Sequence, residues 1–448
     1  MRISSISRAA ITAALSFIAG SPRVAAQGSA PANIANDLDS LIARALVMNP
    51  TVRAATLRVS AARARVGPAG ARPDPLLMAA LQNQPLSGGR DPMTMHMIGI
   101  SRTIPYPGKL PLRTRAAERE VDATAAAVDA TRLDIARQVR AAYYEIAYAD
   151  RSLLILEQNR DVLADVIRVT EVHYSVGTGS QQDVLRARIE ATRLGDEASA
   201  LREQRSAQVA ALNALLDQPS DTPVRAAAVP VRIARAAISD SASHIRFVSD
   251  SLGAPAAGSP LPSLASLQQL AVENNPMLRE HEARIAAQTA RVAGAVKEYK
   301  PDIDVSLQYG QRNGSPDMVT ALVSVPLPIQ RSRKQDQDVA EARAELAALE
   351  AEHHAQVNEL RARVAKVYSD IQRERTQLAL EVKAIIPQGR ASLEAATANY
   401  QAGKADLLTL LDARATLFTY ETSYHRLLTD FAQSLAELEQ LVGKEVLP

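Results

Sequence analysis

Three methionines alternate along the segment PMTMHMIGIS, and their spacing suggests a specific chemistry. In an extended strand successive side chains point to opposite faces, so Met93, Met95 and Met97 fall on one face and His96 on the other. Thioether sulfur is a soft ligand that suits Cu(I) or Ag(I). The pattern indicates a metal site at Met93, Met95 and Met97, with simple packing of a strand face as the alternative.

Other residue patterns that support catalysis or metal binding are missing from the sequence. His353 and His354 are adjacent, and a helix turns neighbouring side chains to different sides, so we interpret them as part of a polar helix face. The motifs GxSxG, HExxH, GxxxxGK[ST] and GxGxxG do not occur. With no cysteine, disulfides, thiolate metal sites and a lipoprotein anchor are excluded. We predict that the protein is not an enzyme and uses no cofactor.

The composition favours long helices over a thick globular core. Aromatic residues make up 3% of the chain and Trp is absent, while Ala, Leu, Arg, Glu and Gln are abundant. The net charge is only +2, on 22% charged residues of both signs. Because no basic surface is implied, nucleic acid is not an expected partner.

The sequence is built from two copies of one plan. YSVGTGSQQDVL begins at Tyr174, and YQAGKADLLTLL begins 226 residues later at Tyr400. Residues 49–82 align with 275–308 at the same offset without a gap, sharing Asn-Pro, a later Pro and Leu-Gln. A chain rich in alanine would not reproduce these pairs by composition alone, so we infer an internal duplication.

Each copy follows the same order of elements. A helix enters before Asn-Pro and continues to residue 70, or to 297 in the second copy, and the period then changes to two, as in a β-hairpin. Long helices with a heptad seam follow, and Pro387 is expected to kink one of them. The predicted divisions are a signal peptide at 1–26, a first repeat at 27–216 with a hairpin at 75–104 and a tip at 174–182, a connector at 217–262, and a second repeat at 263–448 with a hairpin at 301–327 and a tip at 400–406.

The N-terminus has the pattern of a secretory signal peptide. Arg2 and Arg8 precede or flank the short apolar run 9–19, and a small-residue cleavage site follows at 24–26. That run is too short to span a bilayer as a helix, and no other run approaches the length of about 18 residues that this requires. We expect an exported chain without a transmembrane helix.

The predicted strand after Pro301 has one apolar and one polar face. The apolar face carries Ile303, Val305, Leu307 and Tyr309, and the polar face carries Asp302, Asp304, Ser306 and Gln308. Four strands cannot pair their own edges in lipid, so copies of the chain must close a barrel, and two, three or more chains are geometrically admissible. The apolar face would then meet lipid, while Asp302, Asp304 and Gln308 face an aqueous lumen.

Several motifs together resemble the TolC-type outer membrane efflux family. They are the paired Asn-Pro helix starts, the strand exit IPYPGK with its counterpart VPLPIQRSR, and the two Tyr-x-x-Gly helix breaks, and they cover nearly all of the mature chain. The resemblance implies a mainly α fold in which long coiled-coil hairpins form an α-barrel, and four strands per chain contribute to a twelve-stranded trimeric β-barrel. It also implies a homotrimer in the outer membrane with a large periplasmic extension, bound to a periplasmic adaptor and an inner membrane pump.

The resemblance assigns the two glycine breaks to the periplasmic tips of the helical hairpins. Glycine can adopt the left-handed conformation that ends a helix, and Ser180 and Asp406 can cap the helices that follow. In the family the tips meet the adaptor, and simple chain reversal is the alternative role. The residues implied are Val176, Gly177, Thr178, Ala402, Gly403 and Lys404.

The resemblance also implies an acidic aperture just beyond the tips. The family pattern YSVGTxxxxDVLD reads YQAGKADLLTLLD here, so Asp412 matches the later acid, Thr409 replaces the earlier one, and Asp183 holds the earlier position in the first copy. Three symmetry-related Asp412 side chains would repel one another unless a cation or water screened them. A solvated aspartate on a helix face is the alternative.

Together these features predict a passive outer membrane duct of a tripartite efflux system. The PYPGK exit and the methionines favour heavy-metal cations and a pump of the RND type. Export of drugs or proteins (type I) remains open, because a wide lumen selects little. A non-channel periplasmic coiled-coil scaffold is the second alternative, although it would not need four strands with a continuous apolar face.

Overall fold

The computed structural model describes residues 37–86, 91–226, 228–238 and 261–447. The predicted signal peptide and a large part of the predicted connector lie outside the described residues. Within the described part, the first copy contains α1 (Leu38–Met48), α2 (Pro50–Gly70), β1 (Leu76–Gln82), β2 (Met95–Ile104), α3 (Lys109–Ser175) and α4 (Gln181–Leu215).

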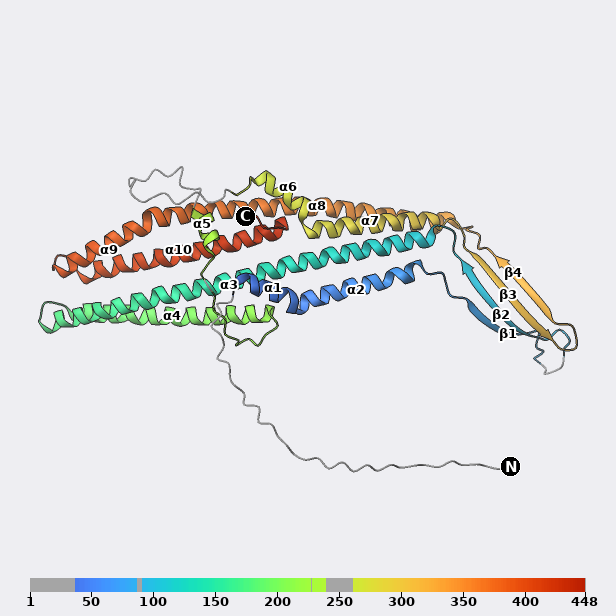
Figure 1. Ribbon diagram of the computed structural model, residues 1–448, viewed down its shortest axis with the longest axis horizontal. Helices are drawn as coiled ribbons and strands as arrows, with labels where there is room; N and C mark the ends of the chain where they lie inside the picture. Colours follow the sequence, from blue (N-terminus) through green and yellow to red (C-terminus); the bar gives the residue numbers. More distant parts are fainter. Residues whose placement is uncertain (1–36, 87–90, 227, 239–260, 448) are drawn as a thin grey trace, which may run out of the picture. The chain divides into compact units, whose positions relative to one another are not determined.

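The second copy repeats this order (Figure 1). After α5 (Val231–Ile238), its elements are α6 (Leu264–Asn274), α7 (Pro276–Lys297), β3 (Ile303–Arg312), β4 (Met318–Ser324), a 3₁₀ turn (Arg331–Arg333), α8 (Gln335–Leu380), a π-helical turn (Glu381–Ile385), α9 (Ile386–Gln401) and α10 (Leu407–Val442). The predicted fold class, mainly helical with four strands and an internal duplication, is confirmed.

The helix at each Asn-Pro pair is interrupted rather than continuous. Asn49 and Asn275 have extended backbones, with ψ of 124° and 122°, because a following proline disfavours helical geometry. Each asparagine side chain accepts a hydrogen bond from the backbone N–H two residues later, at 2.8 Å from Thr51 and 2.9 Å from Met277. The prolines occupy the first turns of α2 and α7, where no backbone N–H is needed.

The irregularity expected at Pro387 lies one turn earlier. Proline removes a hydrogen bond donor and its ring crowds the preceding turn. In the structure the helix widens to a π-helical turn over Glu381–Ile385, and Pro387 then sits in the first turn of α9. The chain therefore accommodates the proline by one wide turn between α8 and α9.

The four strands form one antiparallel sheet in the order β1-β2-β3-β4. The register pairs Ile100 of β2 with Leu307 of β3, and Leu307 with Ala321 of β4. Strands β1 and β4 each have a hydrogen-bonded neighbour on one side only.

Helix α3 is the central rod of the described structure and packs against α2, α4, α7 and α10. The main core lies around its middle, where Tyr143, Tyr144 and Ile146 meet Phe431 of α10. Helix α5 of the connector joins this core, and the buried Arg375 of α8 donates from Nε to the carbonyl oxygen of Ala236 at 3.0 Å. Across the described ranges, no helix combines the length and apolar character needed to cross a membrane.

Candidate functional site

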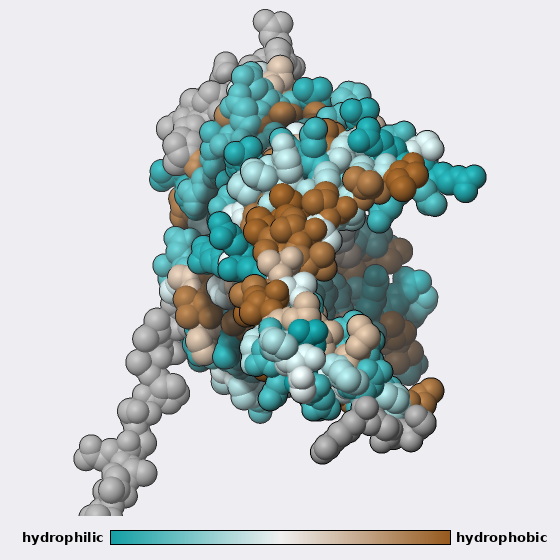
Figure 2. Space-filling model, turned by 90° about the vertical axis from the view of Figure 1, so that its right-hand side faces the viewer, coloured by the Kyte–Doolittle hydropathy of each residue, from teal (hydrophilic) through white to brown (hydrophobic). Residues whose placement is uncertain are grey.

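The two faces of the sheet differ in chemistry, as the strand alternation predicts. One face is apolar, and many of its side chains are exposed in the described chain: Leu77, Ile98, Ile100, Ile303, Val305, Leu307, Tyr309, Val319 and Val323. Figure 2 views the strand end of the molecule and shows hydrophobic side chains gathered on it. Water is a poor solvent for so large an apolar surface, which indicates contact with another apolar phase.

The opposite face carries Asp304, Ser306 and Gln308 on β3. Thr103 of β2 donates a hydrogen bond to the Asp304 carboxylate, and Ser101 lies opposite Ser306. These side chains alternate with the apolar ones, so they share the polar face of the sheet.

Asp302 lies just before β3 and takes part in the junction between helices and sheet. Its Oδ1 accepts a hydrogen bond from the backbone N–H of Tyr106 at 2.8 Å and lies 2.8 Å from Lys109 Nζ. The same Nζ lies 2.7 Å from Oε2 of Glu298, and Lys109 as a whole is only 2% exposed. A buried ammonium between two carboxylates ties together α3, α7 and the start of β3.

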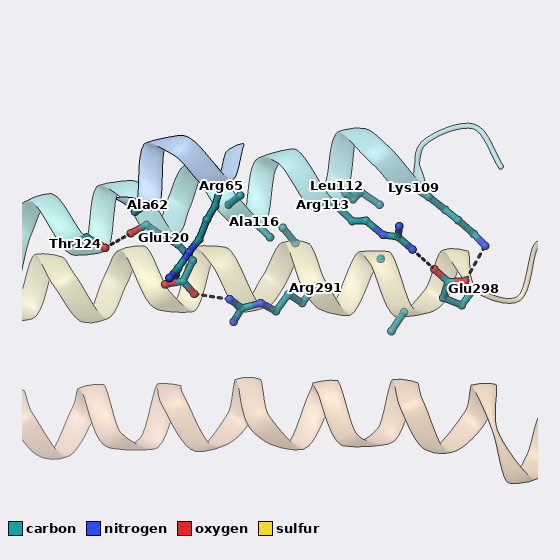
Figure 3. Close-up of a pocket in the computed structure, with 14 residues that line it drawn as sticks. Ala62, Arg65, Lys109, Leu112, Arg113, Ala116, Glu120, Thr124, Arg291 and Glu298 are labelled. Carbon is teal, nitrogen blue, oxygen red and sulfur yellow. Dashed lines mark hydrogen bonds and ion pairs between the residues drawn. The ribbon is translucent and has the colours of Figure 1, made fainter. Parts of the chain in front are cut away.

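A groove of about 680 Å³ lies between α2, α3 and α7, beside this junction (Figure 3). Glu120 forms an ion pair with Arg291, and Arg65 reaches toward the same glutamate. Nη2 of Arg113 lies 3.3 Å from Oε1 of Glu298. Small residues separate these charges: Ala62, Ala116, Ala117, Ala290, Gly294 and Ala295. Both glutamates of the groove are therefore paired with cations. No three His, Asp or Glu side chains of the described residues are placed to hold a metal ion.

The glycine breaks end α3 and α9 in the same way. Gly177 has φ of +77° and Gly403 has φ of +67°, the left-handed conformation that glycine adopts without strain. Thr178 N donates to His173 O at 2.9 Å, and Lys404 N donates to Asn399 O at 2.8 Å, which closes a matching turn in each copy. The six predicted contact residues, Val176, Gly177, Thr178, Ala402, Gly403 and Lys404, are all exposed at these turns.

The N-terminal caps of the helices that follow the tips explain why Thr409 replaces the earlier acid in the second copy. In the first copy Ser180 is the N-cap of α4, and Asp183 completes a capping box, with its Oδ2 2.8 Å from Ser180 Oγ. In the second copy Asp406 is the N-cap, and Thr409 donates from its backbone N–H at 3.0 Å and from its hydroxyl at 2.6 Å. One acid and one hydroxyl occupy each cap, with their positions exchanged.

Asp412 lies on α10 one turn beyond the capping residue Thr409, and it is exposed. Its neighbour Arg414 holds the two helical hairpins together, donating from Nη2 to the backbone oxygen and Oδ1 of Asn159 at 3.2 and 3.1 Å. Nearer the tips, the rings of His173 and Tyr400 stack with centroids 6.1 Å apart. Helix α3 is thus linked to α10 through Asn159 and, nearer the tips, to α9 through His173.

The structure separates Met93 from the other two predicted metal ligands, Met95 and Met97. Met95 and Met97 lie on the polar face of β2, and His96 lies on the apolar face. Met93 lies in the turn before β2, is 66% exposed, and donates its backbone N–H to Asp91 Oδ1 at 2.8 Å. The turn residues take the chain out of the strand alternation that the sequence pattern assumed for Met93.

A duplicated set of long helical hairpins that carries a sheet with an exposed apolar face defines a channel protein of the outer membrane type. The family model described as "Outer membrane efflux protein" matches residues 41–218 and 267–444, and the chain belongs to this family. The two matches begin 226 residues apart, the offset of the repeat. Channels of this TolC-type family are not enzymes, form trimers, and work with periplasmic adaptors and inner membrane pumps.

Two relatives share most of their length with this chain. The cobalt-zinc-cadmium resistance protein CzcC of Cupriavidus metallidurans is 21% identical over 341 residues, which are 75% of this chain and 74% of that protein. Nodulation protein T of Rhizobium leguminosarum bv. trifolii is 23% identical over 342 residues, 74% of this chain and 67% of the relative.

Solved structures show the same fold at low sequence identity. The outer-membrane channel OprN aligns with a TM-score of 0.75 and 19% identity, covering 92% of this chain and 91% of OprN. CusC aligns with a TM-score of 0.75 and 20% identity, covering 92% of this chain and 93% of CusC. The predictions of an outer membrane efflux channel and of a protein that is not an enzyme are confirmed.

Proposed function

We propose that three copies of this chain form a passive duct that carries heavy-metal cations from an inner membrane pump and its periplasmic adaptor across the outer membrane. The observation that carries the proposal is the sheet. It has two unpaired edges, β1 and β4, and one face of exposed apolar side chains.

Closure between copies satisfies both features of the sheet. If β4 of one copy pairs with β1 of the next, no backbone N–H or C=O group is left unpaired in lipid, where each would cost several kcal/mol. Three chains with four strands each give twelve strands, which is enough to enclose a water-filled lumen. The apolar face then contacts lipid, and Asp304, Ser306 and Gln308 line the lumen.

The heavy-metal substrate class is supported by the relative CzcC, which is named for resistance to cobalt, zinc and cadmium. The test is a deletion of the gene in its native host, followed by growth on graded cobalt, zinc and cadmium. We expect reduced tolerance that is restored by the intact chain. Unchanged tolerance to all three metals would remove the support for this substrate class.

The tips of the helical hairpins are the proposed adaptor contacts. Their six residues are exposed and are held in fixed turns, so docking would need little reordering. Single cysteines at Thr178 and Lys404 should cross-link in cells to a periplasmic adaptor and, through it, to a pump of the RND type. A cysteine at the exposed Asn358 of α8 is the matched control. Recovery of an ATP-driven exporter instead would contradict the proposed pump type.

Asp412 is the proposed aperture residue, because its carboxylate is exposed whereas Asp183 and Thr409 are engaged in helix caps. In a trimer three Asp412 carboxylates would surround one axis and favour cations there. Asp183 and Thr409 then contribute by fixing the first turns of α4 and α10.

A further inference from the structure

The polar face of the sheet carries two methionines in addition to those of the segment PMTMHMIGIS. The register places Met78 of β1 opposite Gly99, Met97 of β2 opposite Gly310, and Gly310 opposite Met318 of β4. Residues directly opposite in antiparallel strands share a face, so Met78, Met97 and Met318 lie on the same side as Met95. Four of the eight methionines in the chain therefore share this face, in a band that extends from β1 to β4.

Glycine opens the space between these methionines. A Cβ atom added at Gly310 would lie 3.6 Å from Met95 Sδ and 3.6 Å from Met97 Cγ, so both side chains lean over this residue. Met318 borders the same gap from the next strand. Strands are about 4.8 Å apart, so Met97 of β2 and Met318 of β4 are two spacings, or about 10 Å, apart across a position that has no side chain.

The four methionines lie on the face of the sheet that carries its acidic and amide side chains. The apolar face of the sheet is built from Ile, Leu, Val and Tyr, and none of the four methionines is on it. They share the opposite face with Gln308, Ser306 and Asp304, and also with the exposed Leu76 and Leu322. On this face a neutral soft ligand can meet a cation that moves through water, whereas a methionine on the lipid side could not.

We propose that Met78, Met95, Met97 and Met318 form a band of thioether ligands for a soft monovalent cation, Cu(I) or Ag(I), across the lumenal wall of the duct. This inference rests on the proposed function, because it assumes that the polar face lines the lumen. Thioethers bind such cations without adding charge, and they bind the harder divalent cations poorly. Three copies around the lumen would give a cation several equivalent positions that it can enter and leave.

The positively charged Arg312 of β3 lies directly opposite Met95 in the sheet. Its Nε donates to the carbonyl oxygen of Pro316 at 2.8 Å, which fixes the guanidinium to the turn between β3 and β4. Met95 therefore contributes at the edge of the site nearest this turn, and Met97 occupies its centre beside Gly310.

The test is direct binding of Ag(I) to the purified full-length channel, measured by elemental analysis after gel filtration and by titration calorimetry. We expect saturable silver binding that is lost when Met78, Met95, Met97 and Met318 are all changed to Leu, which nearly preserves volume. Changing Met48 and Met277 to Leu is the control and should leave binding unchanged. Retained silver in the fourfold variant, or no saturable silver in the original chain, would overturn the proposal.

A second variant keeps all four sulfur atoms. Gly310→Val fills the gap between Met97 and Met318, and its added Cβ meets Met95 only at ordinary contact distance, so the sheet should still form. We expect weaker silver binding, with unchanged trimer migration and circular dichroism. Unchanged silver affinity in a folded Gly310→Val channel would show that the gap is not part of the site.

The binding test and the tolerance test fail separately. If deletion lowers metal tolerance but the purified channel binds no silver, the duct function stands and the thioether site is wrong. If silver binds at the four methionines but deletion leaves tolerance to cobalt, zinc and cadmium unchanged, the site stands and the proposed substrate class must be revised.

Discussion

Asn275 and Leu441 are joined by a buried hydrogen bond, in which Nδ2 of the asparagine donates to the backbone oxygen of the leucine at 2.9 Å. The first copy repeats this bond between Asn49 and Leu215 at 3.0 Å. Each asparagine is 4% exposed and also caps a helix, so one side chain both starts a short helix and fixes the far end of a long helical hairpin. Two distant parts of each repeat therefore depend on one residue.

Replacing Asn275 by Ala should lower the free energy of unfolding by about 1–3 kcal/mol, because a buried carbonyl and a helix N-terminus lose their partner. The measurement is urea denaturation of the purified channel followed by circular dichroism. Asn358→Ala, at an exposed position of α8, is the control. Equal stability losses in the two variants would contradict the structural role of Asn275.

Lys109→Met should prevent correct assembly of the sheet on the helices. The substitution leaves the carboxylates of Glu298 and Asp302 close together without the ammonium between them, and breaking a buried ion pair typically costs about 3–5 kcal/mol. We expect loss of the heat-resistant trimer band on gels. Lys300→Met, at an exposed position, should assemble normally. Partial recovery when Glu298→Gln and Asp302→Asn are added would confirm that unpaired charge is the cause.

Glu374 should make stability depend on pH. Burial raises the pKa of Glu374 to about 7. The hydrogen bond from Ser434 and the partly exposed Arg373, whose Nη2 lies 3.5 Å from Glu374 Oε1, lower this pKa but do not offset the effect of burial. The carboxylates of Asp430 and Asp370 raise it further. The folded chain therefore binds this proton more tightly than the unfolded chain. The free energy of unfolding should fall as pH rises from 4.5 through about 7.

Glu374→Gln isolates this effect, because glutamine keeps the neutral form at every pH. At pH 8 we expect the variant to be more stable than the original chain by about 1–3 kcal/mol, and at pH 5 we expect little difference. Thermal denaturation at both pH values measures this, with the exposed Glu394→Gln as the control. A stability difference that is the same at pH 5 and pH 8 would exclude titration of Glu374 as its source.

Asp412→Asn should reduce cation selectivity in planar bilayers. Removing three exposed carboxylates around one axis lowers the negative potential there, and the effect should be larger at low salt, where screening is weaker. The exposed Asp161→Asn on α3 serves as the control. If reversal potentials are the same for Asp412→Asn and the original chain in dilute salt, Asp412 does not line the aperture.

The fold could be predicted because two patterns can be read directly from the order of residues in the sequence. The 226-residue repeat and the alternation of Ile303, Val305 and Leu307 need no knowledge of distant contacts, and both are found in the structure. The tips are equally local, since Gly177 and Gly403 end their helices through bonds within one turn.

Contacts between distant residues could not be predicted in this way. The motif IPYPGK was recognised as a strand exit, but the burial of its Lys109 depends on Glu298, which is 189 positions away. Likewise, the alternation around Met95 and Met97 is visible in the sequence, whereas Met78 and Met318 join them only through the register of the sheet. The Asn-Pro pairs were recognised as repeats and as helix starts, but their hydrogen bonds to Leu215 and Leu441 were not predicted.

The chain has no cysteine, so a spin label on a single introduced cysteine reports one position without background. Labels at Leu307→Cys and Gln308→Cys in reconstituted channels compare the two faces of β3 by their accessibility to oxygen dissolved in lipid and to a water-soluble nickel complex. If the sheet is the wall of a membrane pore, the label at 307 meets oxygen but not nickel, and the label at 308 meets nickel. Shielding of position 307 from oxygen, or equal exposure of both positions to nickel, would contradict a pore wall completed by neighbouring subunits.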